Sequence, residues 1–178
     1  MVIAPSAFKT DLVSAAIAGD QVAFDTLVGP HIETGFRLAT VMLRDGEEAR
    51  DAVQEACFTA WKKLSQLRSE AQLRPWFLTI VANQCRDFRR TRWWSIVRLA
   101  EVRDDREARR TDVESEIDLD RELRTLPRRQ RAALFLFFYL DLPLGEVAGI
   151  LNISPQAAKS LVHRAVVQLR LNLAEVVQ

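Results

Sequence analysis

The spacing of apolar residues constrains the fold of this chain most strongly, because this spacing has the period of a helix along almost the whole sequence. Apolar side chains recur every three or four residues, and no stretch shows the convincing alternation of a half-buried strand. Gly29-Pro30 is expected to separate the first two helices. The predicted helices cover residues 20–28, 31–43, 47–64, about 73 into the arginines near 90, a segment from Pro127, 144–151 and 154–170. The predicted fold class is therefore all-α.

The apolar pattern fades between about Ser95 and Asp118, where charged residues dominate. Such a segment favours a linker over a packed helix. In a chain of 178 residues we therefore predict two small helical domains. They are an N-terminal four-helix unit over 1–95 and a C-terminal helix-turn-helix domain over 119–178, joined by an acidic linker over 96–118.

The net charge is only +1, but charges are segregated along the chain. Residues 44–55 and 101–124 are mainly acidic, residues 74–98 are strongly basic, and the C-terminal stretch is mildly basic. A protein that is basic in two separate places can hold a polyanion at two points. A solvated charged face is the commoner cause of any single run.

The segment 141–170 has the pattern of a helix-turn-helix. Asp141 is expected to cap its first helix, and Ser154 and Pro155 fit the N-cap and first position of its second helix. The second helix would present polar side chains that can enter a DNA major groove. These are Gln156, Lys159, Ser160, His163 and Arg164. On this segment alone, two packed helices of any small α-domain explain the pattern equally well.

Residues 134–140 form an apolar run that would cover most of the circumference of a helix. Such a helix needs burial on more than one side. We expect part of the run to lie in the core and part to form a docking surface.

Other function classes find little support in the sequence. Cys57 and Cys85 are isolated, which favours a reducing cytoplasm over a disulfide-stabilised protein. The first ten residues lack a signal-peptide pattern, and no stretch approaches the roughly 20 apolar residues that span a bilayer. His31 and His163 lie in different predicted domains, and neither metal-ligand spacing nor a catalytic triad is recognisable. We therefore expect no catalytic residue, no metal, no cofactor and no membrane insertion.

Three groups of motifs point to one family. The third predicted helix reads Asp51-Ala-Val-Gln-Glu-Ala-Cys-Phe-Thr-Ala-Trp61, and the fourth reads Trp76-Phe-Leu-Thr-Ile-Val-Ala-Asn-Gln-Cys-Arg-Asp87 before its arginines. The C-terminal motifs are Leu126-Pro127, Gln130-Arg131, Glu146-Val147-Ala148, Ser154-Pro155, Lys159-Ser160 and His163-Arg164-Ala165. In this order they resemble bacterial RNA polymerase sigma factors of the extracytoplasmic-function (ECF) group, in the sigma-70 family.

The resemblance implies a removable specificity subunit, not an enzyme. It implies binding to core RNA polymerase and promoter DNA, with the first domain docking on the polymerase and melting the downstream element. The second domain would read the upstream element. The implied polymerase-binding residues are Asp51, Gln54, Glu55, Phe58 and Trp61. The implied downstream-element residues are Asn83, Arg86, Arg89, Arg90 and Arg92. The implied upstream-element residues are Ser154, Gln156, Lys159, Ser160, His163 and Arg164.

The chemistry of these residues fits the implied roles. Asp51 and Glu55 lie one helical turn apart and can form an acidic ridge that complements a basic helix, although a solvated face is the simpler reading. Phe58 and Trp61 could add apolar contacts or pack inside. On the fourth helix, arginines can neutralise phosphates while a pocket at residues 65–71 accepts an unstacked base. Trp76 and Ile80 are expected in the core.

The chain departs from the ECF pattern at several positions. Cys57 stands where the group usually has phenylalanine, which puts the local packing in doubt. Ala157, Ala158 and Leu161 replace a threonine, a valine and an arginine that are common in the recognition helix. We therefore expect modest affinity for the upstream element or an unusual sequence preference.

The resemblance also implies an anti-sigma factor partner, and the apolar run 134–140 would suit such capture. The acidic linker could imitate nucleic acid or serve as a simple tether. The main alternative function is a helix-turn-helix regulator that acts without polymerase docking. A purely structural helical protein would show no salt-sensitive DNA binding.

Overall fold

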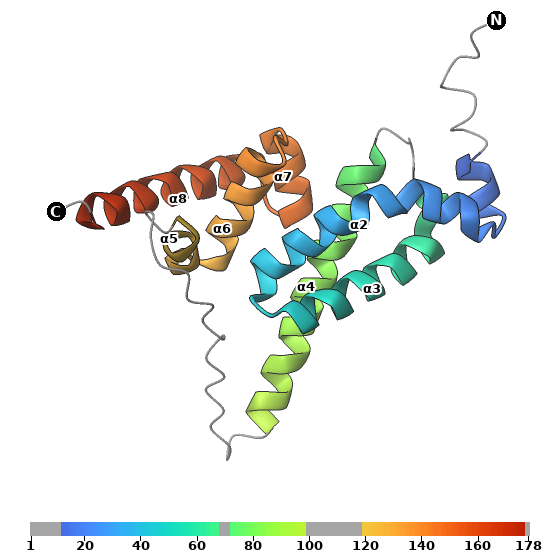
Figure 1. Cartoon of the computed structure of the whole chain (residues 1–178), viewed down its shortest axis with the longest axis horizontal. Coiled ribbons are helices and arrows are strands. Elements are labelled where there is room, and N and C mark those ends of the chain that lie inside the picture. The colour runs from blue at the N-terminus through green and yellow to red at the C-terminus, as the bar shows by residue number, and fades with distance from the viewer. Residues whose placement is uncertain (1–11, 68–71, 99–118, 177–178) are drawn as a thin grey trace, which may run out of the picture.

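The computed structural model describes residues 12–67, 72–98 and 119–176 (Figure 1). The regular elements of these segments are all helical, which confirms the all-α fold class. After a short helix over residues 12–17, the elements are α2 (Gln21–Leu43), α3 (Gly46–Lys63), η1 (Leu64–Gln66), α4 (Leu73–Arg98), α5 (Leu119–Thr125), α6 (Arg128–Leu134), η3 (Phe135–Tyr139), α7 (Leu144–Leu151) and α8 (Pro155–Val176). The predicted linker lies almost entirely in residues 99–118, outside the described part, and α4 continues to Arg98.

Helix α2 contains Pro30, so the predicted break at Gly29-Pro30 is wrong. The helix starts at the N-cap Asp20, whose Oδ1 accepts a hydrogen bond from the Ala23 amide at 3.1 Å. Gly29, Pro30 and Thr26 are all exposed, so the carbonyl that loses its helical partner to the proline is open to water. Packing of the opposite face on α3 and α4 holds the two halves in one helix.

Helix α3 has a side-chain cap at its N-terminal end and favourable charges at both ends. Asp45 Oδ1 accepts hydrogen bonds from the amides of Glu47 at 2.9 Å and Glu48 at 3.0 Å. The acidic residues in the first turn and the lysines in the last turn both interact favourably with the helix dipole. The buried face of α3 is made of alanines and one valine, which lets α3 lie close to α2 and α4.

Helices α2, α3 and α4 form the N-terminal bundle, and α2 and α4 approach each other closely at Gly35. A Cβ atom at Gly35 would lie 3.0 Å from Phe77 Cε1 and 3.2 Å from Val81 Cγ2. Both side chains on α4 are fully buried. Glycine at this position therefore lets α2 and α4 pack at short range.

The C-terminal unit contains the predicted helix-turn-helix, formed by α7 and α8. Asn152 makes the turn in the left-handed region at φ 53°, and Ser154 caps α8 by accepting a hydrogen bond from the Ala157 amide at 3.2 Å. The predicted cap at Asp141 is wrong, because Pro143 occupies the N-cap position of α7. Asp141 lies two residues earlier, at φ 52°, in the turn between η3 and α7.

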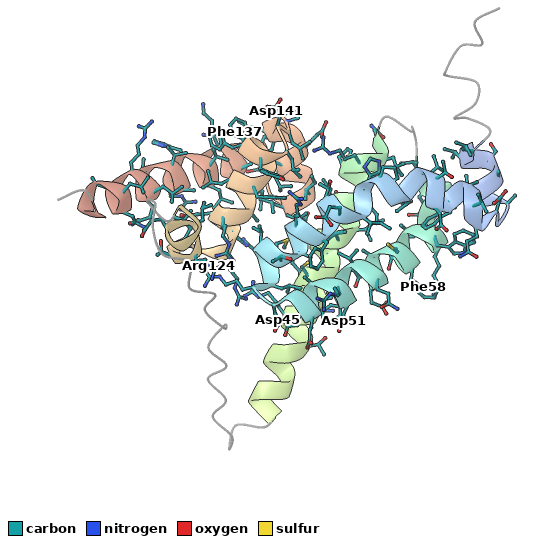
Figure 2. The ribbon with its side chains drawn as sticks, viewed as in Figure 1. Asp45, Asp51, Phe58, Arg124, Phe137 and Asp141 are labelled. Atoms are coloured by element: carbon teal, nitrogen blue, oxygen red, sulfur yellow. The ribbon has the colours of Figure 1, made fainter. Side chains whose placement is uncertain are left out.

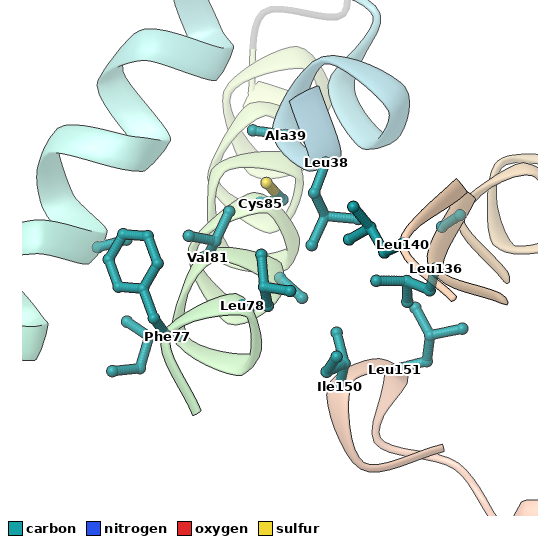
Figure 3. Packing of buried hydrophobic residues seen from close by; sticks show 14 of the residues in the cluster. Leu38, Ala39, Phe77, Leu78, Val81, Cys85, Leu136, Leu140, Ile150 and Leu151 are labelled. Carbon is teal, nitrogen blue, oxygen red and sulfur yellow. The ribbon is translucent and has the colours of Figure 1, made fainter. Parts of the chain in front are cut away.

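The N-terminal and C-terminal units pack against each other. Helix α2 contacts α6 and η3, and α4 contacts α7 (Figure 1). Figure 3 shows Leu38 and Leu78 of the first unit pointing toward Leu136, Leu140 and Ile150 of the second. All five side chains are buried, so one hydrophobic cluster runs through both units.

Candidate functional site

Helix α3 presents the implied polymerase-binding residues on one exposed face. Asp51, Gln54, Glu55, Phe58 and Trp61 follow at intervals of three, one, three and three residues, and all are exposed. We call this set the α3 ridge. Its first half is acidic and its second half aromatic, and Figure 2 shows Asp51 and Phe58 on the outer side of the helix.

The two aromatic residues of the α3 ridge lie at the surface and not inside the bundle. The Phe58 side chain is 56% exposed, and Lys62 Nζ lies 3.8 Å from its ring centroid in a cation–π contact. The Trp61 side chain is 36% exposed and meets Phe24 edge to face, with ring centroids 5.0 Å apart. A partner could therefore bury much of both rings.

An open apolar groove of about 450 Å³ lies beside the α3 ridge, between α2 and α3. Gln54 belongs to both the groove and the ridge. The groove lining also contains Ile32, Glu33, Phe36, Arg50, Val53 and Cys57. Cys57 is half-buried, and burial, helped by the charge of Asp25, raises the pKa of its thiol. A phenylalanine at position 57 would fill part of this groove.

The implied downstream-element residues lie on α4, but they are not equally accessible. Asn83, Arg89 and Arg90 are exposed, and Arg90 forms an ion pair with Asp87 at 3.1 Å. The side chains of Arg92, Trp93 and Trp94 lie outside the described residues. Most of the predicted base pocket at 65–71 also lies outside them, since only η1 and Leu67 are described. Ile80 is buried as expected, and Trp76 is half-buried against the core.

Arg86 lies at the junction of the two units. Its Nη1 and Nη2 each lie 3.4 Å from the carbonyl oxygen of Ile150 on α7, and Nη2 also donates to Asn83 Oδ1. The side chain is half-buried, and this burial lowers the pKa of Arg86, which stays charged. This contact could not be predicted from the sequence, because it joins residues that are far apart in the chain.

The implied upstream-element residues lie on the first turns of α8. Gln156, Lys159, His163 and Arg164 are exposed on one face, while Ser160 is half-buried and donates from Oγ to the Gln156 carbonyl at 2.9 Å. Ser154 is exposed and serves as the N-cap. The opposite face of α8 is buried against α6 and α7 through Ala158, Val162 and Ala165. The residue types and their exposure match the requirements of a major-groove helix.

The apolar run 134–140 is divided between core and surface, as predicted. Leu134, Leu136 and Leu140 are buried, whereas Phe138 and Tyr139 are 61% and 58% exposed. Residues 135–139 form a π-helical turn, in which the Leu140 amide donates to the Phe135 carbonyl at 3.0 Å.

Within residues 12–67, 72–98 and 119–176, His, Cys, Asp and Glu side chains form no group of three or more that could bind a metal ion. None of the helices in these ranges is both long enough and apolar enough to cross a membrane.

Comparison with known proteins places both units in one family. Residues 27–95 match the family model of Sigma-70 region 2, and residues 116–169 match that of Sigma-70 region 4. The chain is 33% identical over 156 residues to the ECF RNA polymerase sigma factor SigM of Mycobacterium tuberculosis, covering 87% of this chain and 79% of the relative. It is 27% identical over 150 residues to the RNA polymerase sigma factor SigV of Bacillus subtilis, covering 84% and 90%.

Two solved structures share the fold. The first is the sigma factor RpoE in complex with the anti-sigma factor NepR from Bartonella quintana, with a TM-score of 0.72, 22% identity and coverage of 87% of this chain and 98% of that one. The second is CnrH in complex with the cytosolic domain of CnrY, with a TM-score of 0.64, 24% identity and coverage of 92% and 96%.

Proposed function

Because the chain belongs to the ECF group of the sigma-70 family and is an alternative sigma factor, we propose a specific use for each of its three polar surfaces. The α3 ridge binds core RNA polymerase. The arginine face of α4 binds and melts the downstream promoter element. The start of α8 reads the upstream element.

The exposed aromatic residues of the α3 ridge are the observation that carries the first assignment. A lone folded chain gains little by leaving Phe58 and Trp61 at the surface, whereas aromatic side chains are enriched at the centres of protein interfaces. The carboxylates of Asp51 and Glu55 add charge complementarity toward a basic partner helix, which sets the orientation of docking. Gln54 continues this surface into the α2–α3 groove.

The assignment of α4 follows from its charge and its exposure. Arg89 and Arg90 can neutralise phosphates and release counterions, and Asn83 can hydrogen-bond a base or a sugar. Arg86 belongs to the same face and, by the family pattern, so does Arg92. Stacking of an unpaired base on a flat side chain contributes about 1–3 kcal/mol, which is comparable to the cost of unpairing it. Strand opening can therefore be driven by binding alone, so we propose that the chain is not an enzyme.

The assignment of α8 rests on its exposed polar face. Gln156 can pair with an adenine edge, while Lys159 and Arg164 can contact guanine or phosphate. Ser154, Ser160 and His163 complete the surface as phosphate or base contacts. We assign the upstream element to residues 119–178 and the other two tasks to residues 1–95, with 96–118 as the acidic linker.

The relatives suggest how the chain is controlled and where it works. RpoE of Bartonella quintana is in complex with an anti-sigma factor, and the present chain shares its fold. We propose that an anti-sigma factor also holds this chain and that the exposed Phe138 and Tyr139 contribute to that interface. We further propose that the chain works in the cytoplasm and joins the nucleoid when it is bound to polymerase. A regulator that acts without polymerase would not need the α3 ridge.

Core binding and transcription in vitro test this proposal. Wild-type chain added to core polymerase should produce specific transcripts from a genomic promoter library. Glu55→Arg should weaken core binding at least tenfold, because it reverses a charge within the α3 ridge. Glu122→Arg on α5 makes the same change of charge outside the ridge and serves as the control.

Each outcome has a defined meaning. If Glu55→Arg and Glu122→Arg both bind core polymerase like the wild type, the α3 ridge is not the docking surface. If the wild type binds core polymerase and yields no specific transcript, the promoter-reading assignment fails.

A further inference from the structure

Arginine side chains join the two units in a regular pattern. Four of the described arginines donate hydrogen bonds across the junction to a backbone carbonyl at or beside the C-terminal end of a helix in the other unit. The donor and acceptor pairs are Arg44 with the carbonyls of Arg124 and Leu126, Arg74 with Leu140, Arg86 with Ile150, and Arg131 with Val41. We call these contacts the arginine caps.

The acceptors are chemically suited to this role. The last four carbonyls of a helix have no partner within the helix and carry the negative end of its dipole. Val41 and Ile150 lie in the last turns of α2 and α7, and Leu140 directly follows η3. The Arg131 guanidinium lies 3.0 Å and 2.6 Å from the Val41 oxygen through Nε and Nη2, and Arg74 Nη2 lies 3.2 Å from the Leu140 oxygen. Each cap satisfies a carbonyl that would otherwise require water.

The arginine caps join the same elements whose apolar side chains meet in Figure 3. A further link comes from Arg37 of α2, which donates to the Tyr139 hydroxyl and lies 5.8 Å from the centre of its ring. Figure 2 shows Arg124 on α5, next to the end of α2 from which Arg44 extends. The closed arrangement therefore depends on polar geometry as well as on burial.

Arg86 has two uses that compete for the orientation of its side chain. As an arginine cap it donates to the Ile150 carbonyl and is half-buried under α7. As part of the downstream DNA surface of α4 it would have to turn the guanidinium toward a phosphate or base, whereas in the closed chain Nη1 and Nη2 face the Ile150 carbonyl. The polar face of α8 has no such conflict, because α8 packs on the elements of its own unit.

We propose that the arginine caps are an internal latch that withholds Arg86 and the adjoining face of α4 from single-stranded DNA until the two units separate, while the reading face of α8 stays open. The inference rests on the proposed function of α4. Strand binding and unit closure then compete for one side chain, so the apparent affinity for the strand is the intrinsic affinity reduced by the fraction of open chains.

The latch is tested by whether a double substitution raises or lowers the affinity of the chain for single-stranded DNA. Arg44→Met/Arg74→Met removes two caps and two positive charges and leaves α4's DNA face intact. Loss of positive charge by itself weakens binding to DNA. The latch predicts the opposite, because each cap biases the closed state by about fivefold, so the double variant should bind a fluorescein-labelled oligodeoxythymidine up to about 25-fold tighter.

Two control variants separate the latch from simpler effects. Arg50→Met/Arg170→Met removes the same charge from two exposed positions outside the caps and should bind the oligonucleotide equally or more weakly than the wild type. Adding Arg86→Ala to Arg44→Met/Arg74→Met should abolish the gain. Small-angle X-ray scattering should show a larger radius of gyration for both cap variants, with helical circular dichroism unchanged.

The proposal is overturned if Arg44→Met/Arg74→Met stays compact, if it opens and binds the oligonucleotide no tighter than the wild type, or if the gain survives Arg86→Ala. Transcription with core polymerase is measured in parallel. If the wild type yields specific transcripts but Arg44→Met/Arg74→Met shows no gain in oligonucleotide binding, only the latch is refuted. If the variant gains oligonucleotide binding but neither it nor the wild type yields specific transcripts, the proposed function is refuted.

Discussion

Replacing Phe58 by alanine should separate the contribution of the α3 ridge to docking from its contribution to folding. Burying a phenylalanine side chain completely contributes about 1.5–3 kcal/mol. Since 56% of Phe58 remains exposed in the free chain, roughly half of that free energy is available to a partner. Aromatic residues at interface centres lose about 2 kcal/mol or more on truncation, so we expect core binding to weaken by about 1–2 kcal/mol, or about 5- to 30-fold.

The same substitution should change the free energy of unfolding by about 1 kcal/mol or less. The fold loses the buried part of the ring and an exposed cation–π contact with Lys62, and it gains the higher helix propensity of alanine. Leu171→Ala is the matched control, because Leu171 has the same exposed fraction, 56%, on α8. Labelled chain titrated with core polymerase gives the affinity, and urea unfolding gives the stability. Binding by Phe58→Ala within twofold of the wild type, with the fold intact, would refute the reasoning.

Three further substitutions and one thiol-labelling reaction test the local structure. Gly35→Ala should destabilise the chain by about 1–3 kcal/mol in urea unfolding, because its Cβ would lie 3.0 Å from a fully buried phenyl ring on α4. Gly149→Ala, with open space around the new Cβ, should instead stabilise by about 0.4–1 kcal/mol, and equal effects of both would contradict the close helix approach. Ser154→Ala should cost about 1 kcal/mol through loss of the α8 cap, and no change in the urea midpoint would argue against that cap. Burial raises the pKa of Cys85 to about 12, so a thiol reagent at pH 8 should modify Cys57 first, and equal labelling rates by mass spectrometry would contradict the buried site.

Features of this fold that depend on neighbours in sequence were predictable. Ser154, Pro155 and the apolar stripe of α8 are local signals, and the structure has the helix, its cap and its exposed face where those signals put them. The exposed face of α3 was predictable for the same reason, since side chains three and four residues apart share one side of a helix. The functional roles of both faces came from the resemblance and stay proposals.

Features that depend on tertiary context were not predictable. A proline usually ends or kinks a helix. At Pro30, however, the packing of α2 on α3 and α4 outweighs the loss of one hydrogen bond. Asp141 has the right residue type for a cap, and only the path of the η3–α7 turn shows that Pro143 takes that position. The apolar run at 134–140 predicted burial, but no local signal could show that part of it would meet α2 and α4.

The arginines of α4 show the same limit for function. In the sequence, Arg86 counts as one more positive charge in a basic helix, equivalent to Arg89 and Arg90. In the structure, the three residues differ: two are exposed, and Arg86 is half-buried on the carbonyl of Ile150. A count of charges along α4 therefore overstates what the closed chain can offer to DNA. Because the difference arises from a contact between units, the DNA-binding capacity that we propose for α4 depends on how far α7 lies from it as well as on the residues of α4 itself.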